Sequence, residues 1–161
     1  MNKKIILASA SPRRKELLKI VVPEFEIETA DADEERIDKG IPVHLYVQEL
    51  ALLKAAAVVK KTGRRRGTLV IGADTVVFHN EKILGKPKDG EDAFDMLCAL
   101  SGDMHSVYTG VCVMDPYTAE IVCRYSKTDV YFKELDPDDV MGYIKGGEPM
   151  DKAGAYGIQG K

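Results

Sequence analysis

The sequence predicts an α/β fold, because short apolar stretches typical of strands alternate along the chain with segments typical of helices. Three stretches carry this prediction. Residues 5–8 form a short apolar run that ends at two serines and a proline. Residues 42–61 repeat apolar residues at helical spacing. Residues 69–77 are almost continuously apolar, as in a central strand buried on both faces.

Length and composition favour one domain, or one domain with a small appendage, because the chain has 161 residues of which 45% are hydrophobic. A net charge of −3 argues against nucleic acid as a partner, which needs an extensive basic face. A membrane is not expected as a partner either, because no apolar run approaches the roughly 20 residues of a span. The three cysteines are odd in number and lack a C-x-x-C motif. We interpret them as small buried hydrophobes in a reducing cytoplasm.

The stretch after the first apolar run has the residues of an anion-binding site. Ser11 suits a helix N-cap, and Pro12 suits the first helical position. Arg13, Arg14 and Lys15 follow, although cations repel the positive end of the helix dipole unless an anion lies there. We therefore interpret this helix start as a phosphate site. The alternative is a solvated basic helix start.

Lys54 interrupts the apolar face of the helix predicted over residues 42–61, which ends at Gly63. Two outcomes stay open: the lysine extends past its neighbours to water, or its ammonium points into a cleft and meets an anion. The apolar residues of this face are Val47, Leu50, Ala51, Ala55 and Val58.

Asp74 interrupts the buried strand predicted over residues 69–77. A buried carboxylate there is costly unless it pairs with a cation or accepts hydrogen bonds. Two residues earlier, Gly72 has no side chain and allows another group to approach the backbone closely. We interpret Asp74 as functional; a structural carboxylate bonded to loop N–H groups is the alternative. The acidic residues 31–35 are interpreted as an exposed loop, with one of them reaching a metal site as the less favoured alternative.

The other predicted elements are less informative about function. His105 is interpreted as structural, and Lys86 lies between glycine and proline with a reachable side chain. Glycines recur at every third residue from 154 to 160, which suggests a backbone that wraps closely around a ligand or another segment. Strands are predicted at 25–29, 83–84, 105–114 and 121–132, and helices at 89–100 and from Pro137, capped by Asp136, to the glycines at 146–147.

Together these motifs resemble those of the Maf family, also known as septum-formation inhibitors and as nucleoside triphosphate pyrophosphatases. The resemblance covers almost the whole chain, with the motifs in the family's order. It implies an α/β fold with a long, bent mixed β-sheet flanked by helices, and two lobes around a nucleotide cleft, as in inosine triphosphatase-like proteins. The matching segments are residues 8–18, 71–77, 84–87, 100–102 with His105, and 148–160.

The resemblance also implies an activity, the hydrolysis of a nucleoside triphosphate to the monophosphate and pyrophosphate with a divalent cation, Mg²⁺ or Mn²⁺. Asp74 matches the proton acceptor, and Asp74 and Glu34 match the metal region. Further matches to the phosphate region or to positions that select the substrate are Ser9, Arg13, Lys54, Thr75, Lys86 and Gln159.

The Asp74–Thr75 pair and Gln159 resemble the branch of the family that acts on dTTP and UTP, with modified pyrimidine triphosphates as a further expectation. The alternative function is a non-catalytic nucleotide-binding regulator of cell division. A homodimer is left open. Because family members normally continue with another strand and helix, we expect residues 1–161 to be a single domain that lacks this C-terminal strand and helix.

Overall fold

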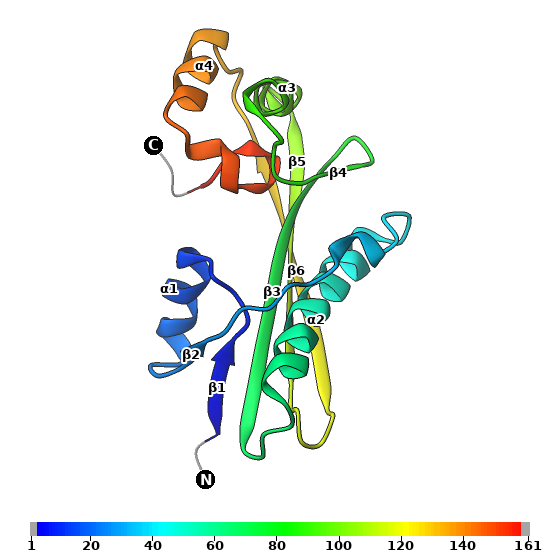
Figure 1. Ribbon diagram of the computed structural model, residues 1–161. Coiled ribbons are helices and arrows are strands. Elements are labelled where there is room, and N and C mark those ends of the chain that lie inside the picture. The colour runs from blue at the N-terminus through cyan, green and yellow to red at the C-terminus, as the bar shows by residue number, and fades with distance from the viewer. Residues whose placement is uncertain (1–2, 159–161) are drawn as a thin grey trace. The chain divides into compact units, whose positions relative to one another are not determined.

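The computed structural model describes residues 3–158 (Figure 1). None of the helices in this range is long and apolar enough to cross a membrane. The strands are β1 Lys4–Leu7, β2 Glu26–Ile27, β3 Thr68–His79, β4 Lys82–Leu84, β5 Met104–Met114 and β6 Ile121–Tyr131. The α-helices are α1 Pro12–Val21, α2 Val43–Thr62, α3 Gly90–Leu100 and α4 Pro137–Lys145, and single 3₁₀ turns lie at Glu34–Arg36, Glu148–Asp151 and Ala153–Ala155.

Within residues 3–158, six strands form one mixed sheet in the order β2-β1-β3-β5-β6, with β4 paired to β3. β1 runs parallel to both of its neighbours, so that Leu7 lies opposite Ile27 on one side and Ile71 on the other. β4 returns antiparallel to β3. The predicted α/β class is therefore confirmed. The strand predicted at 25–29 shrinks to Glu26–Ile27, an exposed pair at the edge of the sheet with a neighbour on one side only.

The chain divides into two compact units. The first contains Asp74 and the residues before it, together with Thr109–Ser126. The second contains Thr75–Tyr108 and the residues from Lys127 onward. The boundary between them falls inside three strands, β3, β5 and β6, so each unit contains part of each of these strands.

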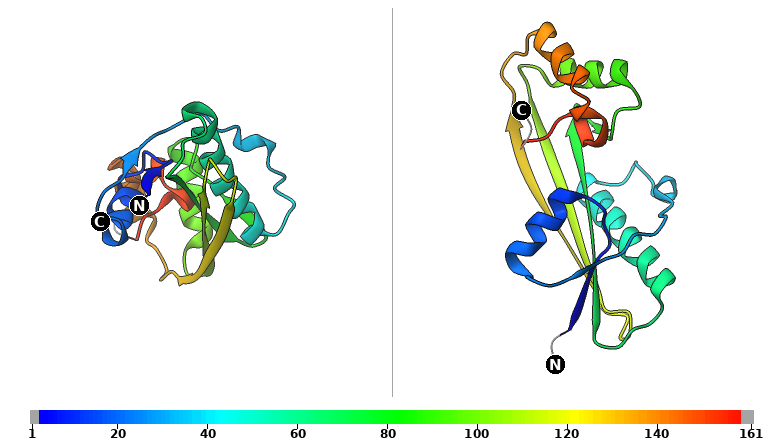
Figure 2. Two further views of the ribbon diagram at one scale, coloured as in Figure 1. Left: turned by 90° about the horizontal axis from the view of Figure 1, so that it is seen from below. Right: turned by 60° about the vertical axis from the view of Figure 1, so that its left-hand side comes forward.

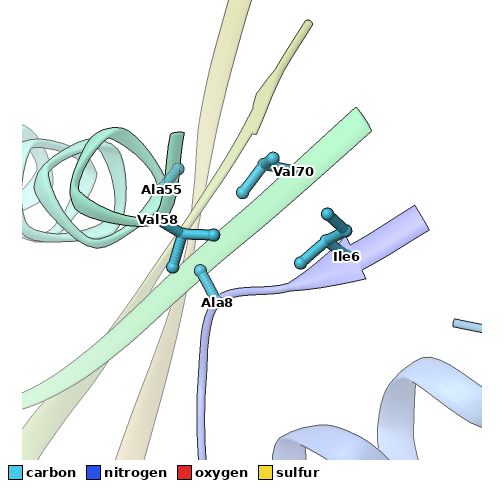
Figure 3. Packing of buried hydrophobic residues seen from close by; sticks show 5 residues of the cluster. All are labelled: Ile6, Ala8, Ala55, Val58 and Val70. Atoms are coloured by element: carbon cyan, nitrogen blue, oxygen red, sulfur yellow. The ribbon is translucent and has the colours of Figure 1, made fainter. Parts of the chain in front are cut away.

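The core of the first unit lies between α2 and the sheet. All five apolar residues predicted for the inner face of the helix are buried, and α2 lies alongside β3 in both views of Figure 2. Part of this core is drawn in Figure 3, where helix residues meet residues of β1 and β3 and the chain just after β1. The cluster shown consists of Ile6, Ala8, Ala55, Val58 and Val70.

Two glycines let the backbone of α2 lie directly on the sheet. A Cβ at Gly72 in β3 would lie 2.1 Å from the carbonyl oxygen of Ala51, and a Cβ at Gly110 in β5 would lie 2.2 Å from that of Val47. No side chain fits into such a gap. The close approach expected at Gly72 is therefore an approach of helix backbone.

The core of the second unit lies where α3 and α4 pack together (Figure 1) and contains Ala93, Leu97, Val140 and Ala155. His105 is 1% exposed, and its Nε2 lies 2.6 Å from the Tyr156 hydroxyl, in agreement with a structural role. The glycine-rich tail packs on another segment of the chain: the N–H of Gly154 donates to the carbonyl of Gly85 at 2.9 Å.

The cysteines differ from the prediction in one respect. Cys112 is buried and Cys123 half-buried, but Cys98 is exposed. The prediction is wrong for Cys98 because α3 turns Ala93, Leu97 and Leu100 toward the core and leaves Cys98 facing water. All three thiols are free.

Replacing Gly110 by alanine is expected to lower the free energy of unfolding by about 1–3 kcal/mol, because the new methyl group forces the helix backbone off the sheet. Gly142→Ala in α4 is the control: nothing lies within 4 Å of its Cβ position, and alanine favours a helix over glycine by up to about 1 kcal/mol. Urea denaturation of both variants checks this, and equal stabilities would contradict the close contact.

The lowered pKa of His105 should make the stability of the protein depend on pH. Burial lowers the pKa of His105 below its ordinary 6.5, and the nearby His79 lowers it further. Above pH 6.5 neither the folded nor the unfolded state binds this proton. Below it the unfolded state binds a proton that the folded state rejects, so stability falls until the pH reaches the lower folded pKa.

Asp103, Asp115 and Asp129 have carboxyl pKa values lowered below the ordinary 3.8, so the titration of these three groups lies below this pH range. Urea unfolding between pH 7.5 and 5 should therefore show a decline in wild-type stability that is weaker in His105→Phe. Parallel pH profiles would show that another group causes it.

Candidate functional site

Asp74 reaches the candidate site because of its register in β3. Side chains alternate between the faces of a strand, so Asp74 shares a face with Gly72. That face is the one on which α2 lies, since a Cβ at Gly72 would meet Ala51 and Ala55 of the helix. Asp74 is 9% exposed. The buried strand therefore presents a carboxylate to the inner face of α2.

Both oxygens of this carboxylate are held by cations. Arg14 Nη2 donates to Oδ1 at 2.9 Å, and Lys54 Nζ donates to Oδ2 at 2.8 Å. The side chains of Arg14 and Lys54 are 23% and 21% exposed, so both cations are mostly removed from water. Two charged hydrogen bonds offset the cost of burying Asp74. Of the two outcomes open for Lys54, the structure shows the one in which its ammonium meets an anion.

Lys54 also brings in the acidic loop. Its Nζ lies 3.0 Å from Glu34 Oε1, at the first residue of the 3₁₀ turn Glu34–Arg36. The ammonium thus joins two carboxylates, one from β3 and one from the loop. Glu34 itself stays half-exposed, at 51% of its side chain. The less favoured alternative, that one acidic residue of 31–35 reaches a metal site, stays a prediction, because the partner of Glu34 in the structure is the Lys54 ammonium.

The start of α1 is arranged differently from the prediction. Pro12 is the first helical residue, but Ser11 makes no side-chain capping bond. Instead Ser9 Oγ accepts from the Ser11 N–H at 3.2 Å and from Arg14 Nη1 at 3.4 Å. Asp74 supplies negative charge to Arg14 at this helix start. The repulsion between the cations and the helix dipole is therefore partly compensated within the protein.

The structure brings five candidate residues together in the first unit: Ser9, Arg14, Glu34, Lys54 and Asp74. Their roles in binding and catalysis stay predictions, as do those of the remaining candidates.

Arg13, on the first turn of α1, is half-buried. Thr75 and Lys86 belong to the second unit. Thr75 is half-buried on the opposite face of β3 from Asp74, and Lys86 is exposed in the loop between β4 and α3. Gln159 lies outside the described residues.

Tyr46 is a neighbour of the site that the sequence analysis did not identify. Burial raises the pKa of its phenol, and the charges of Glu34 and Asp74 raise it further. Tyr46 lies two helical repeats before Lys54 on the same face of α2, as the buried positions 46, 50 and 58 indicate. That i, i+4, i+8 spacing is the signal in the sequence that could have placed it near Lys54.

The carboxylates at this site suit a divalent cation that is bound together with a phosphate. Asp74 and Glu34 already share one positive centre, the Lys54 ammonium, at 2.8 and 3.0 Å. Within residues 3–158 no group of three or more His, Cys, Asp and Glu residues gathers around a common point. Mg²⁺ is commonly held by one or two carboxylates, with substrate phosphates and water completing its shell. The donor set therefore fits such a cation.

Solved structures share this fold. The Ham1 protein of Staphylococcus aureus aligns with a TM-score of 0.57 and 17% identity over 80% of this chain and 71% of its own. A nucleoside-triphosphatase, dITP/XTP pyrophosphatase, of Mycobacterium abscessus aligns with a TM-score of 0.52 and 17% identity over 80% and 72%. At this identity the likeness concerns the fold alone.

Other relatives have a much higher sequence identity to this chain than these solved structures do. A dTTP/UTP pyrophosphatase of Clostridium perfringens is 50% identical over 157 residues, which are 98% of this chain and 81% of that protein. A dTTP/UTP pyrophosphatase of Clostridium botulinum is 50% identical over 159 residues, 99% of this chain and 82% of that protein. The model of the Maf-like protein family matches residues 4–161. The chain therefore belongs to the Maf family.

Proposed function

We propose that this protein hydrolyses dTTP and UTP to the corresponding monophosphate and pyrophosphate. The observation that carries the proposal is the convergence of two mostly buried cations, Arg14 and Lys54, on the single carboxylate of Asp74 at the start of α1. Relatives with about 50% identity over nearly the whole chain are named dTTP/UTP pyrophosphatases, which supports the same substrates.

The cations have a role in binding the triphosphate. Arg14 and Lys54 each already hold an anion with a charged hydrogen bond, and phosphate oxygens accept such bonds equally well. The N–H groups of the first turn of α1 add further donors. Arg13 and Lys86 are proposed to supply the remaining positive charge that a triphosphate requires. Such positioned charge accounts for much of the rate enhancement in phosphoryl transfer.

Asp74 is proposed to accept the proton of the attacking water. When phosphate oxygens take over Arg14 and Lys54, the oxygens of Asp74 lose donors and become available to orient and deprotonate a water molecule. A bound Mg²⁺ or Mn²⁺, held by Asp74 and Glu34, would lower the pKa of water and polarise the phosphate. Ser9 Oγ accepts from Arg14 Nη1 at 3.4 Å, while Nη2 donates to Asp74, so Ser9 is proposed to help orient the guanidinium.

Selection of the base is proposed to involve Thr75, Gln159 and Arg13, the positions that match those used for substrate choice in the family. A polar group that bonds the correct base discriminates strongly, because a wrong base leaves that group without its partner.

A panel of nucleoside triphosphates with Mg²⁺ tests the proposal. Separation of pyrophosphate from orthophosphate identifies the bond that is cleaved. We expect pyrophosphate from dTTP and UTP, with kcat/KM at least about tenfold above that for ATP and GTP. Comparable turnover of ATP would contradict the pyrimidine preference. Tight binding of dTTP without any turnover would favour the alternative function, a non-catalytic nucleotide-binding regulator of cell division.

Replacing Lys54 by alanine should affect activity far more than Lys61→Ala on the same helix. Both variants lose one positive charge, but Lys54 holds Asp74 and Glu34, whereas Lys61 holds Glu28 and a backbone carbonyl at the surface. A charged hydrogen bond is worth about 1.5–3 kcal/mol, so kcat/KM for dTTP should fall at least about tenfold in Lys54→Ala. Equal losses of kcat/KM in the two variants would contradict the proposed role of Lys54 in binding the triphosphate.

Asp74→Asn keeps the size of the side chain and removes its charge and basicity. Turnover should fall by about 10²–10⁴-fold. Stability should fall by about 1–3 kcal/mol, because Arg14 and Lys54 lose their shared partner in a mostly buried place. Asp31→Asn in the exposed acidic loop is the control and should change neither quantity. Normal turnover with lowered stability would make Asp74 a purely structural carboxylate.

A further inference from the structure

Two of the three cysteines face each other across the hairpin of β5 and β6. The hairpin closes where the Asp115 N–H donates to the carbonyl of Glu120 at 2.9 Å, and the carbonyl of Asp115 accepts from the N–H of Ala119 at 2.9 Å. Three residues before Asp115 lies Cys112, and three residues after Glu120 lies Cys123. In an antiparallel pair these two positions are directly opposite one another.

The hairpin register also sets the kind of pair. Hydrogen-bonded and non-hydrogen-bonded pairs alternate along an antiparallel ladder. Asp115 holds a hydrogen-bonded position opposite a two-residue bulge, since its N–H donates to Glu120 and its carbonyl accepts from Ala119. The pair three steps further along both strands is therefore of the non-hydrogen-bonded kind. Its Cα atoms lie about 4.5 Å apart, within the roughly 4.4–6.8 Å that a disulfide spans. The backbone is therefore spaced for a bond between Cys112 and Cys123 without any rearrangement of the strands.

The two thiols interact and differ in access. Burial raises the pKa of the Cys112 thiol, and a side-chain hydrogen bond with Cys123 raises it further. Cys112 is 0% exposed and shares its face of β5 with Gly110, against which α2 packs. Cys123 is half-buried on β6, the last strand in the order of the sheet. A small reagent can therefore reach the Cys123 thiol, whereas the Cys112 thiol next to it is buried.

We propose that Cys112 and Cys123 are a modification site that forms a reversible intrachain disulfide with a small-molecule disulfide oxidant such as oxidised glutathione. The Cys123 thiolate attacks one sulfur of the oxidant, forms a mixed disulfide and releases one thiolate. Cys112 then gives up its proton, its sulfur attacks the Cys123 sulfur, and the second thiolate leaves. Two protein thiols are oxidised, and the oxidant is reduced to two thiols.

The test uses Cys98→Ser, which removes the exposed thiol of α3 and leaves the pair. The folded variant is incubated with oxidised glutathione, remaining thiols are blocked with iodoacetamide, and the protein is analysed by mass spectrometry before and after reduction. The expected product has lost both thiols, carries no glutathione, runs as a monomer without reductant, and yields a peptide pair joined through Cys112 and Cys123. Dithiothreitol should restore both thiols.

A second variant separates the two steps. In Cys98→Ser with Cys112→Ala, Cys123 should stop at the mixed disulfide and keep one glutathione. If Cys98→Ser itself keeps a glutathione on Cys123 without joining Cys112, or if both thiols stay unmodified, the proposal is wrong. A bond that forms only in urea also overturns it, because the folded hairpin is what holds the two sulfurs together.

Discussion

The contact on which the first unit depends is that of the α2 backbone with the sheet at Gly72 and Gly110. The absence of a Cβ at each of these positions lets helix carbonyls approach to distances that any side chain would prevent. The same contact sets the height of Lys54 above β3, and hence its bond to the Asp74 carboxylate. Packing and the charged site are therefore one arrangement, and a change in the glycines would be felt by the ion pairs.

The charged cluster balances its own charge. Arg14 and Lys54 match Asp74 and Glu34, which is what allows a carboxylate to sit in a buried strand. This balance also constrains the proposed chemistry, since a triphosphate competes for the cations with the carboxylate that is proposed to act as the base. Binding and activation of Asp74 are then linked, because the donors that leave Asp74 are the ones that hold the substrate.

Much of the fold could be predicted from patterns that are local in the sequence. The apolar face of α2, the long run of β3 and the proline at the start of α1 all follow from spacing and residue type. The pairing of Arg14 with Asp74 and the facing cysteines could not, because they join residues that are far apart along the chain or depend on hairpin register. Cys98 shows the same limit, since its exposure depends on how α3 packs.

The division of β3 between the two units has a consequence for the proposed roles of its residues. Asp74 is the last residue of one unit in this strand, and Thr75 is the first of the other. Their Cα atoms are joined by a single trans peptide and so stay about 3.8 Å apart whatever arrangement the units adopt. The residue proposed to accept a proton and the residue proposed to help recognise the base are thus tied by covalent geometry. Their side chains nevertheless point to opposite faces of β3, so the two proposed roles would be carried out on different faces of one strand.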